Sequence, residues 1–172
     1  MFLAHREAVL SLGSNLGNRE QIVRRAIEAL RAHPELRVTA VSSLWESPSW
    51  KPEGEGLGPD YINAIVLATT AMAPTELLHE TQALENAFGR ERAERYADRT
   101  LDVDIVAFGI EQQTSAELTL PHPRAHERAF VLHPWTEVDA NAELPGHGSV
   151  AELAEYCDGD VWLASNQAED AR

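Results

Sequence analysis

The stretch "RTLDVDIVAF", residues 99–108, has the composition of a buried β-strand but carries two aspartates. Side chains alternate between the two faces of a strand, so Asp102 and Asp104 project from one face and the aliphatic residues between them from the other. Two carboxylates about 6.5 Å apart repel by about 2.5 kcal/mol at an effective dielectric near 20. This repulsion favours a neighbouring cation, and a divalent metal ion is the simplest candidate. The alternative is a solvent-facing strand whose alternate positions are merely polar.

Four arginines occur within the ten residues that end where this strand begins: Arg90, Arg92, Arg95 and Arg99. Guanidinium groups bind phosphate through paired hydrogen bonds. Taken alone, these arginines could equally belong to a solvated loop in which they pair with Glu91 and Glu94. Next to the aspartate pair, they favour phosphoryl-type transfer, in which catalysis is mostly positioning and charge neutralisation.

Composition limits the class of protein. The 172 residues suit one domain, and the formal net charge of −14 opposes general binding to nucleic acid or anionic membranes. The single cysteine, Cys157, leaves no internal disulfide and fits a reducing compartment. The start lacks a signal-peptide pattern, and no apolar stretch is long enough to span a bilayer. We expect a cytoplasmic protein with one domain at 1–164 and a frayed polar tail at 165–172.

The remaining chain supplies partners for the aspartate strand. Further strands are expected at 8–13, 36–47 and 60–70, with one helix that follows Asn18 and ends at Pro34 and another from Pro74 to Gly89. The order strand–helix–strand, strand–helix–strand predicts an α/β (α+β) fold with a ferredoxin-like βαββαβ core. In that core both helices pack on one face of a mostly antiparallel sheet. A C-terminal extension follows, with a short strand at 117–123 and short helices at 126–135 and 150–157.

Other candidate motifs are weaker. "GSNLGN", residues 13–18, matches neither the dinucleotide-binding nor the P-loop pattern, and a strand-to-helix turn explains it. His122 and His126 have a zinc-like spacing, but Pro123 separates them and no third ligand is evident, so His122 is better explained as a hydrogen-bond donor near the site.

The Pro/Gly-rich loop at 48–59 is flanked or occupied by Trp45, Trp50 and Tyr61, which could form an apolar slot for a flat ring. Core packing is the alternative for each of these aromatic residues. Asn63 shares a strand face with Tyr61, and its amide could read the edge of a heterocycle.

Together these residues resemble one family, the 6-hydroxymethyl-7,8-dihydropterin pyrophosphokinases of folate biosynthesis. The similarity runs through "LSLGSNLGNR", "SSLWESP", "PDYINAIV", "ETQALENAFGRERAERYADRTLDVDIVAFG" and "LTLPHPRAHERAFVLHP". It implies a ferredoxin-like core and transfer of pyrophosphate from ATP to the pterin hydroxymethyl group, with release of AMP. It also implies an enzyme that usually acts as a monomer on these two small substrates.

The resemblance implies a role for each matching residue. Asp102 and Asp104 would hold two Mg²⁺ ions that bridge the ATP phosphates, and Arg90, Arg92 and Arg99 would clamp the triphosphate. The residues implied for the pterin pocket are Ser47, Pro48, Tyr61, Asn63 and Phe130. The residues implied for the nucleotide side are Gln82, Glu85, Ile105, Thr119, His122 and Arg128, with Gln82 and Glu85 on the same side of their helix.

Two segments depart from the family pattern: Tyr96-Ala97-Asp98 before the clamp arginine, and Ser49-Trp50-Lys51 in the long loop. They put the kinetics in question more than the reaction. Two other hypotheses stay open at the level of sequence. One is a different Mg²⁺-dependent phosphoryl or nucleotidyl transferase, and the other is a non-catalytic ferredoxin-like ligand-binding domain.

Overall fold

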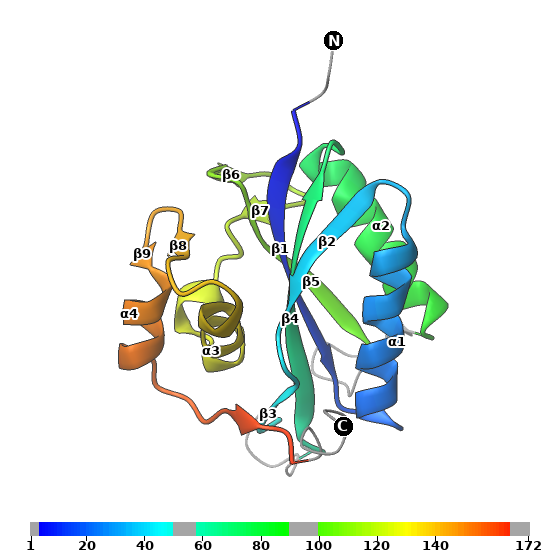
Figure 1. Cartoon of the computed structure of the whole chain (residues 1–172), viewed down its shortest axis with the longest axis vertical. Coiled ribbons are helices and arrows are strands. Elements are labelled where there is room, and N and C mark those ends of the chain that lie inside the picture. The colour runs from blue at the N-terminus through cyan, green and yellow to red at the C-terminus, as the bar shows by residue number, and fades with distance from the viewer. Residues whose placement is uncertain (1–3, 50–57, 90–99, 166–172) are drawn as a thin grey trace.

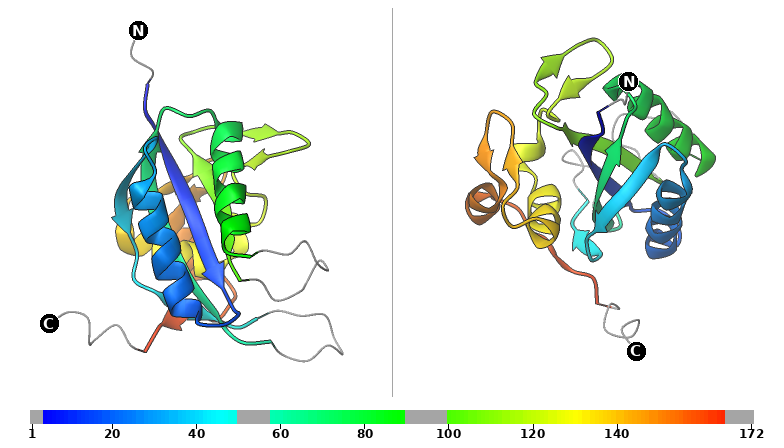
Figure 2. Two further views of the ribbon diagram at one scale, coloured as in Figure 1. Left: turned by 90° about the vertical axis from the view of Figure 1, so that its right-hand side faces the viewer. Right: turned by 45° about the horizontal axis from the view of Figure 1, so that its top comes forward.

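The computed structural model describes residues 4–49, 58–89 and 100–165. A central sheet lies between two layers of helices, with α1 and α2 on one face and α3 and α4 on the other (Figures 1 and 2). The strands of this sheet are β1 (Arg6–Ser14), β2 (Leu36–Val41), β3 (Trp45–Ser47), β4 (Tyr61–Thr70), β5 (Asp102–Phe108) and β10 (Trp162–Leu163). Their order is β10-β3-β4-β1-β5, with β2 also paired to β4, and every described pairing is antiparallel. The predicted ferredoxin-like core is confirmed.

The strand predicted at 36–47 is two strands. β2 pairs with the second half of β4 and β3 with the first half, and the chain bends between them. At the bend, Ser42 replaces the regular ladder: its backbone N–H donates to the Ile65 carbonyl (2.9 Å), and its hydroxyl accepts the Ile65 N–H (2.8 Å). The hydroxyl satisfies a buried amide that a continuous strand would have paired through its backbone.

Helices α1 (Arg19–Ala32) and α2 (Pro74–Ala87) begin where the sequence predicts. The Asn18 side chain accepts a hydrogen bond from the Gln21 N–H (3.2 Å), and Pro74 occupies the first turn of α2. Ala29 of α1 and Ala83 of α2 are exposed. The buried stripe of α2 consists of Leu77, Thr81 and Glu85.

The C-terminal extension covers the second face of the sheet. It contains the 3₁₀ turn η1 (Ala125–Glu127), α3 (Ala129–Val138) and α4 (Val150–Tyr156), together with the hairpins β6 (Gln113–Thr114) with β7 (Thr119–Leu120) and β8 (Glu143–Leu144) with β9 (Gly148–Ser149). Both faces of β1 are therefore buried: Leu10 and Leu12 pack toward α1 and α2, and Val9 packs toward α3. No described helix is both long and apolar enough to cross a membrane.

A β-bulge interrupts the pairing of β5 with β1. Leu10 is opposite Ile105, and Val9 is opposite Ala107, so Val106 is an extra residue on β5. The extra residue changes which face later side chains occupy, and Phe108 joins Ile105 in the core beneath α1 and α2. The Val106 carbonyl accepts the backbone N–H of His122 (2.8 Å), which ties the 121–128 segment to the strand that carries the aspartates.

We expect Leu10→Ala to lower the free energy of unfolding by about 2–5 kcal/mol, because it leaves a cavity between the sheet and helices α1 and α2. Leu163→Ala is the control, since this side chain is 53% exposed and its truncation is expected to cost about 0.5 kcal/mol or less. Urea unfolding measures both values. Equal losses in the two variants would contradict the assignment of the core.

Candidate active site

The two aspartates lie on β5, an edge strand of the main sheet, and face the layer that contains α3. Both are partly exposed, in contrast to the five residues of β5 that are buried. In the register with β1, Asp104 is opposite the buried Ser11, and Asp102 is opposite Gly13. The predicted placement of the two carboxylates on one face is confirmed.

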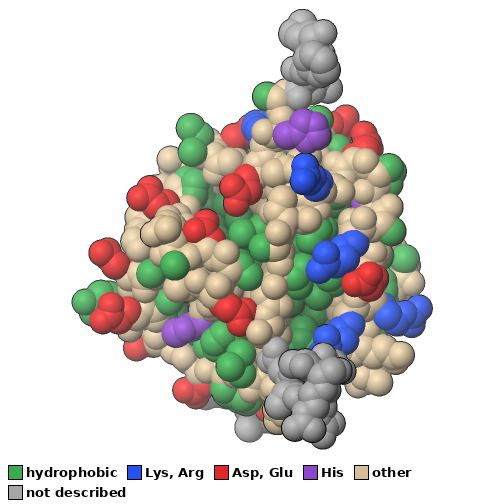
Figure 3. Space-filling model, viewed as in Figure 1, with side chains coloured by type: hydrophobic (Ala, Val, Ile, Leu, Met, Phe, Trp, Pro, Cys, Tyr) green, Lys and Arg blue, Asp and Glu red, His purple; other side chains and the backbone are tan. Residues whose placement is uncertain are grey.

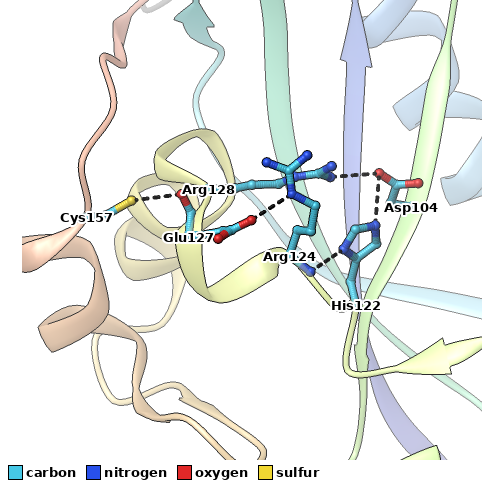
Figure 4. A network of polar contacts seen from close by, with 6 residues as sticks. All are labelled: Asp104, His122, Arg124, Glu127, Arg128 and Cys157. Carbon is cyan, nitrogen blue, oxygen red and sulfur yellow. Dashed lines mark hydrogen bonds and ion pairs between the residues drawn. The ribbon is translucent and has the colours of Figure 1, made fainter. Parts of the chain in front are cut away.

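Asp104 faces two nitrogen-bearing side chains from the 121–128 segment (Figure 4). Arg128 Nη1 lies 3.6 Å and His122 Nε2 lies 3.9 Å from Asp104 Oδ2. Burial lowers the pKa of Arg128, whereas the carboxylates of Asp104 and Asp102 act to raise it. Since a guanidinium stays protonated at physiological pH, Arg128 supplies a positive charge beside the aspartate pair.

His122 is held in one tautomer by its own turn. Its Nδ1 accepts the backbone N–H of Arg124 (3.2 Å), so in the neutral ring the proton is on Nε2, the atom that faces Asp104. Burial lowers the pKa of His122, Asp104 acts to raise it, and Arg128 and Arg124 lower it further. The net shift is downward, which favours the neutral donor form at pH 7. The 121–128 segment therefore presents the Nε2–H of His122 on the face of β5 that carries Asp104.

Arg124 does not contact Asp104 through any described hydrogen bond or ion pair; it pairs with Glu127. Its Nε donates to Glu127 Oε1 (2.7 Å), and this hydrogen bond lowers the pKa of Glu127. The Cys157 thiol at the end of α4 donates to the Glu127 carbonyl oxygen (3.2 Å). His126 stacks on His147, with the ring centroids 4.2 Å apart and the planes at 8°. The two histidines that the sequence places four apart thus have different partners, since His122 faces Asp104.

Asn63 and Ser47 lie on the neighbouring strands of the same sheet. The Asn63 side-chain amide donates to the Trp45 carbonyl (3.3 Å) and to Ser47 Oγ (2.9 Å). Because a carbonyl only accepts, these bonds fix the orientation of the amide and leave Asn63 Oδ1 as the atom available to a ligand. Oδ1 lies over Gly13, 3.4 Å from the position that a β-carbon there would take.

The register aligns these residues in a row. Asp102 is opposite Gly13, Gly13 is opposite Asn63, and Asn63 is opposite Trp45. Asp102 and Asn63 are two strand spacings apart, about 9.5 Å, with only backbone between them at Gly13. Trp45, one of the aromatic residues considered for a ring-binding slot, is half-buried with its ring centroid 6.2 Å from that of His133 in α3.

The remaining residues of the implied pterin set differ in their surroundings. Phe130 is half-buried, and the Arg128 guanidinium carbon lies 5.5 Å from the centroid of its ring. Tyr61 is half-buried with Cδ1 close to Gly13, and Pro48 is exposed. The fold thus brings the aromatic, amide, guanidinium and carboxylate groups onto one face.

The implied nucleotide residues lie on both sides of the edge strand β5. His122 and Arg128 are on the aspartate side, whereas Gln82 and Glu85 belong to α2 on the other side. Glu85 is buried, but Gln82 is exposed, so the two differ more in environment than their helical spacing suggests. The Ile105 side chain packs in the core beneath α1 and α2, directed away from Asp104, and Thr119 is half-buried in β7.

The predicted triphosphate clamp, Arg90, Arg92 and Arg99, lies outside the described residues, as do Arg95 and Trp50. The variant segment Tyr96-Ala97-Asp98 lies outside them too.

Three residues that shape the site region were not assigned to it at the level of sequence: Gly13, Asn15 and Arg19. Gly13 was predicted as the last residue of the strand at 8–13 and the first of the following turn, and its pairing within β1 agrees with the strand, but no place in the site was assigned to it. Its signal was a glycine at the end of an apolar strand pattern. Asn15 in "GSNLGN" and Arg19 directly after it donate to the carbonyls of Pro59 and Asp60, the two residues that precede β4. This contact needed the tertiary structure to be found.

The carboxylates of Asp102 and Asp104 suit a hard cation that substrate phosphates help to bind. Among the described residues, no group of three or more His, Cys, Asp or Glu side chains is placed to hold a metal ion by itself. Mg²⁺ is commonly bound by one or two carboxylates together with substrate phosphates. Asp102 and Asp104 therefore fit a Mg²⁺–phosphate complex better than a protein-only metal site.

A ferredoxin-like sheet that presents paired carboxylates, a guanidinium and an imidazole N–H on one face has groups suited to a phosphoryl transferase. Residues 9–140 match the model of the 7,8-dihydro-6-hydroxymethylpterin-pyrophosphokinase (HPPK) family. The chain is 40% identical over 136 residues to the 2-amino-4-hydroxy-6-hydroxymethyldihydropteridine pyrophosphokinase of Bacillus subtilis, covering 79% of this chain and 80% of that protein. It is 36% identical over 146 residues to the enzyme of that name from Haemophilus influenzae, covering 85% and 89%.

The fold is also shared with solved structures. The wild-type HPPK-DHPS of Plasmodium falciparum with pteroate superposes with a TM-score of 0.69 over 88% of this chain, at 12% identity. The present chain spans 42% of that chain. The chain belongs to the 7,8-dihydro-6-hydroxymethylpterin-pyrophosphokinase family, whose members are ATP-dependent diphosphotransferases.

We expect alkylation of Cys157 by iodoacetamide to have a pH midpoint above that of a cysteine-containing reference peptide. Burial raises the pKa of the thiol, and Asp158 and Glu127 raise it further. Because only the thiolate reacts, alkylation near neutral pH will be slow. Asp158→Asn will lower the midpoint without bringing it to the reference value, since burial is the larger cause. A wild-type midpoint at or below that of the peptide would contradict the described environment.

Proposed function

We propose that this chain transfers pyrophosphate from ATP to the hydroxymethyl oxygen of 6-hydroxymethyl-7,8-dihydropterin in folate biosynthesis and releases AMP. The observation that carries this proposal is the family match, because it extends over residues 9–140 and so includes every described site residue. The row from Asp102 to Asn63 supports it independently, since it joins a charged end suited to phosphate to an amide suited to a heterocycle.

We assign Asp102 and Asp104 as the ligands of two Mg²⁺ ions held jointly with the ATP phosphates. Bound Mg²⁺ would supply charge neutralisation to the triphosphate. The carboxylates are suited to this role because they are partly exposed, lie on one face and belong to a well-packed strand. Arg128 and His122 place further positive or N–H groups beside Asp104, where phosphate oxygens would lie.

The pterin is assigned to the row between Asp102 and Asn63. The ring edge would donate to Asn63 Oδ1, since both amide hydrogens are already used by Trp45 and Ser47. Tyr61 and Phe130 would contact the ring faces, and the backbone of Ser47 and Pro48 would complete the pocket. With the ring edge at Asn63, a substituent on the opposite side of the bicycle is directed toward Asp102.

The nucleotide is assigned to the outer edge of β5. His122 and Arg128 would bind phosphate oxygens on the aspartate side, and Gln82, Glu85 and Thr119 would contact the nucleoside portion. Ile105 would contribute through its backbone, because its side chain is committed to the core. The sequence resemblance adds Arg90, Arg92 and Arg99 as the triphosphate clamp.

The chemical step needs alignment more than a strong base. The hydroxymethyl oxygen attacks the β-phosphorus in line and forms a new O–P bond. At the same time, the bond breaks between the β-phosphorus and the oxygen that it shares with the α-phosphorus. The electron pair stays on that oxygen, which leaves as part of AMP, and the hydroxyl proton is released to solvent. Arg128 favours this step by balancing negative charge near Asp104, and the neutral His122 presents its Nε2–H on the same side. We further propose that the enzyme acts in the cytoplasm as a monomer.

We expect Asp104→Asn to lower kcat/KM for AMP and pterin diphosphate formation by about 10²–10³-fold, as loss of a preorganised charge-stabilising group commonly does. Asn is nearly isosteric but removes a metal-binding charge. Titration with Mn²⁺ in the presence of a non-hydrolysable ATP analogue gives a second readout, in which the variant should bind the metal more weakly. Glu155→Gln on α4, an exposed acid, is the matched control. Normal turnover and Mn²⁺ binding in Asp104→Asn would refute the metal assignment.

We expect Arg128→Met to weaken binding of the ATP analogue about ten- to a hundredfold, the range for one charge-assisted hydrogen bond. Arg124→Met is the matched comparison, because this arginine is more exposed and its guanidinium is bound to Glu127. It should lose far less affinity. Isothermal titration calorimetry with Mg²⁺ present measures both. Equal losses would show that general positive charge, not the position of Arg128 beside Asp104, governs binding.

A further inference from the structure

Gly13 is a glycine in a place where neither the backbone nor the turn requires one. It lies within β1, paired with Asn63 on one side and with Asp102 on the other. It is not among the described glycines that adopt positive φ. In a regular strand, glycine loses more conformational entropy than other residues and packs no side chain, so it weakens the strand.

Packing gives no reason for this glycine either. Among the described residues, a β-carbon at position 13 would lie 3.4 Å from Asn63 Oδ1 and 3.5 Å from Tyr61 Cδ1. Both are ordinary van der Waals distances, and the next atom, the Ile62 carbonyl oxygen, is 3.9 Å away. An alanine therefore fits the described structure without moving its neighbours. The described structure thus has room for a methyl side chain at position 13, where the sequence has glycine.

The missing β-carbon would stand on the face that carries the site. It would project between Asp102 and Asn63 and beside Oδ1, the one Asn63 atom that its hydrogen bonds leave free to accept from a ligand. A methyl group there would partly cover that acceptor. It would also occupy, with one carbon atom, the space above the Gly13 backbone between Asp102 and Asn63.

We propose that Gly13 is a specificity-determining residue whose missing side chain leaves room beside β1 for the pterin ring that Tyr61 and Phe130 hold. This inference rests on the proposed function and adds a residue to it. The absence of a side chain lets the ring lie close enough to β1 for its edge to reach Asn63 Oδ1 while its hydroxymethyl group extends toward Asp102. Any side chain at position 13 lifts or tilts the ring, so it weakens pterin binding and misaligns the attacking oxygen together.

The test is a size series, Gly13→Ala and Gly13→Val, in the full chain. Pterin binding is measured by ligand fluorescence with Mg²⁺ and a non-hydrolysable ATP analogue present. We expect Gly13→Ala to bind pterin about tenfold more weakly or worse, as added methyl groups in packed sites do, and Gly13→Val to show no measurable pterin binding. Affinity for the ATP analogue should stay within about twofold of wild type, since the change adds no charge and lies away from Arg128 and His122.

The thermal unfolding temperature distinguishes a role in binding from a role in folding. If Gly13 served only the fold, its replacement would lower that temperature. Because glycine is unfavourable in a strand, Gly13→Ala should unfold at the wild-type temperature or above it. A folded Gly13→Ala variant with normal pterin affinity would overturn the proposal. So would a variant that unfolds at a lower temperature, since glycine would then serve the fold, or one that loses ATP and pterin equally.

Pterin binding and AMP formation by the wild-type protein show whether a failed test refutes the role of Gly13 or the proposed function. If the wild type neither binds the pterin nor forms AMP with it, the proposed function fails before position 13 is tested. If the wild type binds pterin and Gly13→Val binds it equally well, the proposed function stands and only the role of Gly13 is refuted.

Discussion

The pairing of β5 with β1 is the constraint on which the site depends. Antiparallel register places Asp102 beside Gly13 and Asp104 beside Ser11, and strand alternation keeps both carboxylates on the α3 face. A shift of one residue would bury the carboxylates in the core beneath α1 and α2 and expose Val103 and Ile105 instead. The hydrophobic cost of that shift is what fixes the carboxylates in place. The bulge at Val106 then ends the strict alternation just beyond the site, and its carbonyl anchors the loop that brings His122 and Arg128 to Asp104.

Local electrostatics at the site run against the charge of the whole chain. The formal net charge is −14, yet the groups placed against Asp104 are an arginine and a histidine. In the view of Figure 3 the acidic side chains are spread mainly over the side of α4, while arginine side chains lie over the side of α1 and β2. General acidity disfavours polyanions at long range, whereas a small anion close to Arg128 interacts mainly with its immediate neighbours because salt screens the distant charges. An acidic protein can therefore hold a site for a triphosphate.

The other half of the site is organised by hydrogen-bond polarity. The Trp45 carbonyl can only accept, so it forces the Asn63 amide nitrogen toward β3 and its oxygen toward Gly13. Ser47 takes the second amide hydrogen and completes the arrangement. The sheet thus fixes which hydrogen-bonding character a ligand must present before any ligand arrives. Preorganisation of this kind reduces the entropy lost on binding, because the side chain is already ordered.

The sequence by itself determined the order of the core elements, the shared face of the two aspartates and, through its motifs, the family. Those properties depend on local periodicity, on capping residues such as Asn18 and on contiguous segments, so they can be read along the chain. The tertiary structure alone decided that the strand predicted at 36–47 breaks at Ser42, that the C-terminal extension covers the second face of the sheet, and that His122 faces Asp104 while His126 stacks on His147. It alone brought Arg128 to Asp104 and set Gly13 between Asp102 and Asn63. These relations are made by cross-strand register and by packing between distant segments, and no spacing along a single strand or helix encodes them.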